Sequence, residues 1–327
     1  MGNENGDESG SGWGGFWISL VGGLLCVVAI DAIFGSVMDD VYARSSKNPL
    51  ANIERANTPW LSLGSSISKY ALDPSVMTLP IYNAGQNGQG IYYVIAVLSA
   101  LPEDTAVKNV IWFYDPADLV EPVGEGNSLN LRAITPLSKD SSRLKTWIAA
   151  GDKLKSLALH SNLYRYRLLA PGIVIRAIWP QWSLSGYAPV PFDGSAQDFA
   201  SQKSAQSPDP SQQDVTERLV MSNDGRHALQ VLAEIVKNRT IHLVVVSPPI
   251  WGDKRTTNPV YTNLYTQMRS ALSGLGVCDL TGPLGSGLNH MSTMESLFFD
   301  GAHFNHQGAQ YFSRRLDRLI KKSCLTR

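Results

Sequence analysis

The sequence contains few charged residues, few cysteines and no excess of either charge. Asp, Glu, Lys and Arg make up 17% of its 327 residues, below the usual ~25%. The 28 basic residues equal the 28 acidic ones in number. Without a net positive field, nucleic acid is not expected as a partner. The 28 Gly and 18 Pro residues are too few for a collagen-like or low-complexity chain.

Three cysteines cannot form the dense disulfide framework of a small secreted domain, and none belongs to a Cys-x-x-Cys pair that would indicate structural zinc. Cys26 lies in an apolar run. Cys278 and Cys324 either pair in an oxidising compartment or remain two buried thiols. His303 and His306 form a His-x-x-His pair, but no second acidic or cysteine cluster accompanies them. No metal site and no cofactor are therefore expected.

The N-terminal part of the chain has one long apolar run. Residues 1–15 are rich in Gly, Ser and acidic residues and contain no Lys or Arg, which predicts a disordered tail. Residues 16–38 are predominantly apolar, with Asp31 as their one charge, and a helix of this length can cross a bilayer core, which needs ~20 residues. We expect a transmembrane anchor with Asp31 near an interface or against a partner, the alternative being a buried core helix. A cleaved signal peptide is disfavoured, because a basic start and an Ala-x-Ala site are missing.

The residues that follow the apolar run carry information on orientation. Residues 39–58 are predicted to be a polar connector. Arg44, Lys47 and Arg55 all follow the run, and no Lys or Arg precedes it. Taken alone, the positive-inside rule then favours a main domain in the cytoplasm.

Residues 59–327 read as one domain in which short β-like runs alternate with helical runs. The clearest predicted strands cover residues 60–63, 79–83, 110–114, 241–246 and 276–280, and the clearest helices cover 91–101, 215–237 and 307–322. This alternation predicts the α/β class, with a mostly parallel sheet between two helical layers in a three-layer α/β/α sandwich. Residues 193–214 are rich in Ser, Gln, Asp and Pro, which predicts a mobile surface loop.

Three segments place polar groups where reactive groups are expected in such a sheet, just after its strands. In Gly64-Ser65-Ser66, a hydroxyl at a strand-to-helix turn lies beside free backbone N–H groups. The stretch 83–88, Asn-Ala-Gly-Gln-Asn-Gly, lets backbone approach a substrate closely. In 300–308, an Asp three residues before a His can fold back to the imidazole and hold its tautomer. Singly, these patterns are also typical of a helix cap, a tight turn and a surface pair.

In this order the three segments resemble the SGNH (GDSL-like) hydrolase superfamily, specifically its membrane-anchored bacterial members. Those proteins have an N-terminal anchor, a Gly-Ser-Ser block, a block reading like Tyr-Asn-Ala-Gly-x-x-Gly-Gln-Gly, and a closing Asp-x-x-His-x-Asn-x-x-Gly. The corresponding residues here are 64–66, 82–90 and 300–308. The blocks span residues 60–315, although the middle of the chain is not recognisable. The resemblance implies a flavodoxin-like sandwich and acyl-ester chemistry.

The resemblance also implies residue roles. Ser66 would be the nucleophile, His303 the general base and Asp300 the carboxylate that orients the base. The oxyanion would be bound by the backbone N–H groups of Ser66 and Gly88 and by a side-chain amide.

Two positions depart from the family's pattern. Asp115, in the block 112–116, stands where an Asn is expected, and an ionised carboxylate would repel an oxyanion. Either Asp115 is protonated, or Asn83 or Asn87 supplies the amide, or the site is impaired. Ile67 also stands where Arg is common after the two serines.

Membrane-anchored relatives in this superfamily act in O-acylation, typically O-acetylation, of extracellular polysaccharide beside a multi-pass membrane acyltransferase. The resemblance therefore implies an extracytoplasmic, periplasmic carbohydrate O-acetyltransferase or acetylesterase, and this overrules the Lys/Arg orientation signal. A tethered enzyme gains a high effective concentration near a polymer exported through the same membrane. One alternative is a non-catalytic SGNH-like subunit that binds glycan or scaffolds a membrane complex. Another is a lipolytic esterase, for which the sequence offers no obvious lid.

Overall fold

The structure, a computed structural model, describes most of the chain but not its first residues or several stretches in the middle. The predicted mobile loop, 193–214, lies outside the described residues. The described residues are 12–120, 134–138, 144–146, 159–166, 169–182, 185–187, 221–250, 259–281 and 286–325.

A five-stranded parallel sheet forms the centre of the domain. Its order is β2-β1-β3-β4-β5, one of the two common orders of doubly wound sheets, in which ligands bind where the strand order reverses. The prediction of an α/β fold with a parallel sheet is confirmed, and each predicted strand overlaps an observed one. The strands are β1 (Trp60–Leu63), β2 (Ile81–Asn83), β3 (Asn109–Phe113), β4 (His242–Val246) and β5 (Cys278–Asp279).

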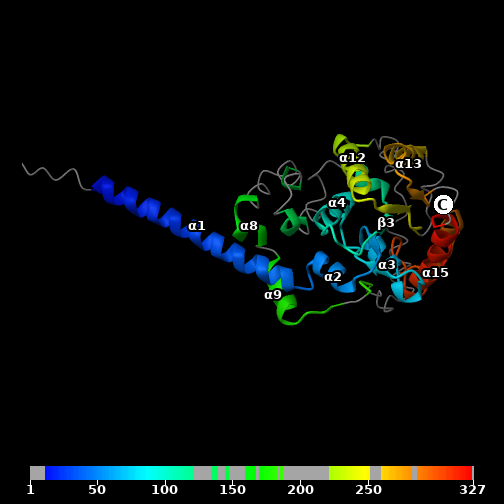
Figure 1. Ribbon diagram of the computed structural model, residues 1–327, viewed down its shortest axis with the longest axis horizontal. Coiled ribbons are helices and arrows are strands. Elements are labelled where there is room, and N and C mark those ends of the chain that lie inside the picture. The colour runs from blue at the N-terminus through cyan, green and yellow to red at the C-terminus, as the bar shows by residue number, and fades with distance from the viewer. Residues whose placement is uncertain are drawn as a thin grey trace, which may run out of the picture.

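The sheet is buried on both faces. In β3, Trp112 belongs to one hydrophobic core and its neighbour Phe113 to another, because successive side chains of a strand point to opposite faces. The helices α4 (Ile91–Ala100) and α12 (Asn223–Asn238) contribute to the first core, and α15 (His306–Ser323) contributes to the second (Figure 1). Burial on both faces explains why the strands read as continuous apolar runs.

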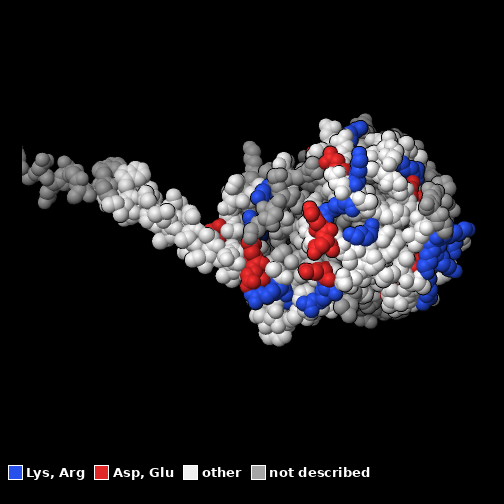
Figure 2. Space-filling view, in the orientation of Figure 1, with Lys and Arg blue, Asp and Glu red and all other residues white. Residues whose placement is uncertain are grey.

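The helix α1 (Gly12–Arg44) projects from the domain (Figure 1). It begins inside segment 1–15, which we expected to be disordered. Of the described helices it is the one long and apolar enough to cross a membrane, and Figure 2 shows no charged side chain along its outer part. Residues 15–30 are all exposed, and residues 12–30 measure about 28 Å at 1.5 Å per residue, close to the ~30 Å of a hydrocarbon core. Single membrane spans and signal sequences share this length and hydropathy.

From Asp31 onward, α1 lies against the domain. The side chain of Ser161 donates a hydrogen bond to the Asp31 carboxylate at 2.8 Å, and the backbone N–H groups of Asn162 and Leu163 each donate one at 2.9 Å. These donors stand at the start of α8 (Asn162–Tyr166). The charge in the apolar run therefore has its partner within the same chain, and the exposed part of α1 is shorter than the predicted span.

The segment predicted to be a connector, 39–58, is helical instead. The helix α1 continues to Arg44, and α2 (Pro49–Ala56) follows after a short turn. Tyr42 and Ile53 belong to the hydrophobic core that covers one face of the sheet. The polar composition of the segment concealed these few apolar side chains, which are buried only because α1 and α2 fold back onto the domain. The hydrophobic core of the domain therefore includes residues that precede residue 59.

Cys278 and Cys324 form a disulfide between β5 and the residue that follows α15. Of the two possibilities that the sequence left open, paired or free thiols, the structure has the pair. The two cysteines are 46 residues apart, so the bridge closes a long loop.

Removing this bridge is expected to lower the free energy of unfolding by about 4 kcal/mol, because the unfolded chain regains the entropy of an open loop of this length. The double variant Cys278→Ala/Cys324→Ala and the native chain would be unfolded with denaturant in the same detergent. Cys26→Ala, which replaces the exposed free cysteine of α1, is the matched control and should leave the midpoint unchanged. Equal midpoints for the double variant and the control would show that the bridge does not form.

Candidate active site

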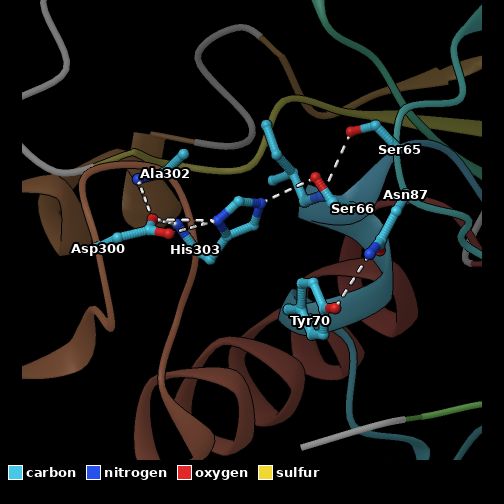
Figure 3. Close-up of polar contacts among 8 residues, drawn as sticks. Ser65, Ser66, Tyr70, Asn87, Asp300, Ala302 and His303 are labelled. Carbon is cyan, nitrogen blue, oxygen red and sulfur yellow. Dashed lines mark hydrogen bonds and ion pairs between the residues drawn. The ribbon is translucent and has the colours of Figure 1, made fainter. Parts of the chain in front are cut away.

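Ser66, His303 and Asp300 come together although almost the whole domain separates the first from the other two in sequence. The Nε2 atom of His303 lies 2.8 Å from the Oγ of Ser66, and its Nδ1 atom lies 2.8 Å from Oδ2 of Asp300. Figure 3 shows the imidazole between the hydroxyl and the carboxylate. The side chains of His303 and Asp300 are each 23% exposed, so the pair is shielded but reachable. A hydroxyl, an imidazole and a carboxylate in series allow the imidazole to take the hydroxyl proton.

The turn between β1 and α3 (Ser66–Ala71) presents the hydroxyl. Gly64 has a φ of +150°, and a Cβ at this position would lie 2.8 Å from the Cβ of Phe113, so a side chain is excluded on both counts. Ser65 is the N-cap of α3, and its Oγ accepts the Ile67 N–H at 3.3 Å. Ser65 therefore caps the helix, whereas Ser66, its first residue, points its hydroxyl to the imidazole.

The loop before α15 holds the carboxylate and the imidazole in fixed orientation. Oδ1 of Asp300 accepts the backbone N–H groups of Ala302 and His303, both at 2.7 Å. Burial opposes ionisation of Asp300, but the hydrogen bonds from the His303 side chain and the Ala302 backbone outweigh it and keep the pKa of this carboxyl below its ordinary value. An ionised Asp300 favours the tautomer of His303 that carries its proton on Nδ1 and turns a free Nε2 lone pair to Ser66.

The remaining residues of the closing motif build the helix that follows. Asn305 is the N-cap of α15, and its Oδ1 accepts the Gly308 N–H at 2.9 Å. A Cβ at position 308 would overlap the carbonyl oxygen of Leu297, so the close approach of these two segments requires glycine. The Asn and Gly of Asp-x-x-His-x-Asn-x-x-Gly therefore fix the place of the loop that carries His303.

The two backbone N–H groups predicted to bind the oxyanion are those of Ser66 and Gly88. The N–H groups of Ser66 and Gly88 have no hydrogen-bond acceptor among the described residues. For Ser66 this follows from its place in the first turn of α3, where backbone N–H groups have no acceptor within the helix. Both groups remain available to an acceptor on a substrate.

Asn83 does not supply the side-chain amide of this site. Its Nδ2 donates to the backbone carbonyls of Ser68, Lys69 and Leu72 at 3.1, 3.2 and 2.8 Å, and the residue is only 1% exposed. The amide thus donates to carbonyls at the end of α3, where backbone C=O groups run out of N–H donors within the helix. The sequence placed Asn83 near the site correctly but could not show that the end of α3 would occupy its amide.

Asn87 lies at the surface, and its Nδ2 donates to the hydroxyl of Tyr70 at 3.2 Å (Figure 3). Sequence reasoning missed Tyr70, whose ring meets the ring of His303 edge to face with centroids 5.4 Å apart. Tyr70 follows Ser66 by four residues in α3, and residues at this spacing lie on one face of a helix. That spacing was the available signal for a side chain that packs against the imidazole.

Asp115, in the block 112–116, lies just after β3. Its backbone carbonyl accepts the Asp118 N–H at 3.1 Å at the start of η2 (Pro116–Leu119), and the residue is half-buried. Because β1 and β3 are parallel neighbours, Asp115 and Ser66 both follow strands that end at the same edge of the sheet.

The described residues contain no group of three or more His, Cys, Asp or Glu side chains that could hold a metal ion. His306 has other partners: its Nδ1 lies 3.1 Å from the hydroxyl of Tyr187, and its Nε2 lies 3.2 Å from Nε2 of Gln310. No protein-family profile matches the chain, and no curated protein sequence matches it either. What the site can do therefore follows from its own geometry and residue pattern.

Proposed function

We propose that the protein is a serine-dependent acyl-ester enzyme, an O-acetyltransferase or acetylesterase that acts on carbohydrate. The observation that carries this proposal is the continuous chain of hydrogen bonds from Ser66 through His303 to Asp300. A serine at a helix start needs no contact with an imidazole, and a surface Asp–His pair needs no contact with a serine, so neither alternative explains both hydrogen bonds. Three groups in series are what a serine hydroxyl needs to become a nucleophile near neutral pH.

The geometry supports a two-step acyl transfer. Ser66 Oγ attacks the carbonyl carbon of an acyl ester while His303 takes its proton; the bond to the leaving alcohol then breaks, and His303 returns the proton to that alcohol. Water or a sugar hydroxyl next attacks the acyl-Ser66 carbonyl and gives its proton to His303. The bond between the acyl carbon and Ser66 Oγ then breaks, the free acid or the acylated sugar leaves, and His303 returns the proton to the serine oxygen. In both steps the N–H groups of Ser66 and Gly88 would receive the negative charge on the carbonyl oxygen. Asp300 would stabilise the positive charge on the imidazole.

The finer fold assignment belongs to the same proposal. The strand order, the helices on both faces of the sheet and the N-terminal helix all agree with an SGNH-type three-layer sandwich on a membrane anchor. The partner that the resemblance implies, a multi-pass membrane acyltransferase, stays a prediction.

We infer that α1 anchors the protein in the cell membrane with its domain on the extracytoplasmic side. The Cys278–Cys324 disulfide supports this side, because disulfides persist in oxidising compartments and are rare in the cytosol. The Lys and Arg residues after the apolar run favour the opposite side. That signal is the weaker of the two, since large domains translocate largely regardless of nearby charge.

The direct test is the full chain in detergent, incubated with a fluorophosphonate probe and separately with p-nitrophenyl acetate. The full chain is needed because Tyr42 and Ile53, which precede the predicted domain start at residue 59, belong to the core. Covalent labelling of Ser66 together with release of p-nitrophenol is the expected result. A chain that is folded by circular dichroism but shows neither would instead favour the non-catalytic subunit that binds glycan or scaffolds a complex.

Asp115 favours the non-catalytic alternative, because an ionised carboxylate at this position would repel an oxyanion. Replacing it by Asn tests whether it impairs the site. Asp115→Asn is expected to keep turnover of p-nitrophenyl acetate or to raise it by up to about 100-fold, the usual effect of one oxyanion donor. Asp104→Asn, which replaces an exposed carboxylate before β3, is the control and should change nothing. A large loss in Asp115→Asn would show that the carboxylate itself is needed.

A further inference from the structure

We propose that a cavity beside the catalytic serine binds an anionic group of the substrate, which makes the substrate an acidic carbohydrate; this inference rests on the proposed function. The cavity has a volume of about 390 Å³. It lies between the end of α1, α2, the loop after β2 and α9 (Ala170–Ile178). Of its described lining residues only Lys47 and Lys69 are charged, and no Asp or Glu is among them.

Among the described residues, no carboxylate pairs with the positive charges at this cavity. No described carboxylate forms an ion pair with Lys47, Lys69 or Arg176. Partial burial lowers the pKa of Lys47, and repulsion from Arg176 and Lys69 lowers it further. Because Lys69 and Arg176 both repel Lys47, an anion placed between Lys47 and Lys69 in the cavity would be stabilised by their charge.

The cavity is joined to the catalytic turn by the chain itself. Lys69 follows Ser66 by three residues in α3, a rise of about 4.5 Å along the helix axis. Gln86 lines the cavity and donates its backbone N–H to the Gly64 carbonyl at 3.0 Å, so loop 83–88 borders the cavity and contacts the turn that carries the serine. Ser66 itself does not line the cavity. A substrate with its ester at the serine would therefore place a neighbouring group, not the ester, between the lysines.

The lining suits a charged sugar. The volume falls within the usual range of small-molecule sites, and the neutral polar residues Ser46, Asn52 and Gln86 line the cavity together with the two lysines. Ammonium groups bind carboxylate or phosphate as point charges with several donors each. A uronic acid and a phosphorylated sugar share this chemistry. A phospholipid headgroup also offers phosphate, but the loop shared with Ser66 favours the substrate.

The test measures binding without catalysis. The full chain carrying Ser66→Ala, in phosphatidylcholine nanodiscs at low salt, would be titrated calorimetrically with glucuronate, glucose 1-phosphate and glucose. At least one anion is expected to bind about tenfold or more tighter than glucose, the effect of one charge-assisted contact, and the better anion identifies carboxylate or phosphate. Lys47→Gln and Lys69→Gln should each remove about tenfold in affinity for that anion.

Matched controls decide the outcome. Lys237→Gln, which replaces an exposed lysine of α12, should leave the affinity for the anion unchanged. Equal binding of all three sugars, or anion binding that survives both Lys47→Gln and Lys69→Gln, would overturn the inference. The inference would also be overturned if neither sugar anion bound and the two lysines instead bound the protein to nanodiscs that contain phosphatidylglycerol, because the lysines would then recognise a lipid headgroup. Because these titrations need no turnover, they fail independently of the esterase assay on the native chain.

Discussion

Ser66→Ala is expected to abolish fluorophosphonate labelling and to reduce hydrolysis of p-nitrophenyl acetate by about 10³-fold or more, as removal of a serine nucleophile does. The hydroxyl lies 2.8 Å from the only imidazole nitrogen that can take its proton in the observed arrangement, since the other faces Asp300. Ser66 is half-exposed in the first turn of α3. Its replacement by alanine should therefore leave the fold intact, which circular dichroism would check.

The adjacent serine provides a matched control. Ser65→Ala removes the N-cap of α3 and should cost about 1 kcal/mol of stability, but it should retain labelling and most turnover. If Ser66→Ala is still labelled while Ser65→Ala is not, the roles of the two serines are reversed. If both variants are labelled, the nucleophile lies elsewhere and the proposed function is wrong.

Asp300→Asn is expected to lower turnover by about 10³- to 10⁴-fold while the fold is kept. An Asn side chain can still accept the N–H groups of Ala302 and His303 through its oxygen. Its amide nitrogen, however, would donate to Nδ1 of His303. That contact would favour the tautomer with the proton on Nε2, which can no longer accept the proton of Ser66.

Asp317→Asn is the control for this substitution. Asp317 accepts hydrogen bonds from the side chain of Thr78 and the backbone of Leu79, so it joins α15 to the loop before β2 without touching the imidazole. We expect Asp317→Asn to lower stability by about 1–3 kcal/mol and to leave turnover of the folded chain nearly unchanged. Full turnover in Asp300→Asn would show that another group orients His303.

The residues that the sequence revealed share a local signal. Ser66 directly follows a strand, and Asp300 and His303 lie within one turn of each other, so short patterns were enough to find them. That Ser66 and His303 would meet was implied by the family resemblance, and the parallel sheet agrees with it, because reactive groups gather at the carboxyl ends of its strands. The strands were visible for a related reason, since burial on both faces makes each a short apolar run.

The features that the sequence did not reveal depend on contacts between distant segments. The amide of Asn83 was one candidate donor to the oxyanion, whereas carbonyls at the end of α3 occupy it. The burial of Tyr42 and Ile53 requires α1 and α2 to fold onto the domain, and nothing in the polar segment around them shows that contact. The partner of Asp31 lies some 130 residues away, beyond the reach of any periodicity.

The hydrogen bonds to Asp31 have a mechanical consequence. With α1 in the bilayer, the domain would be joined to the membrane rigidly and not through a flexible linker. Residues 31–44 of α1 pack against the domain, and the Asp31 carboxylate binds the start of α8. The reactive serine would then keep a constant height above the lipid, and only rotation about the helix axis and lateral diffusion would let it search. A polymer leaving the membrane would have to pass at that height to be modified.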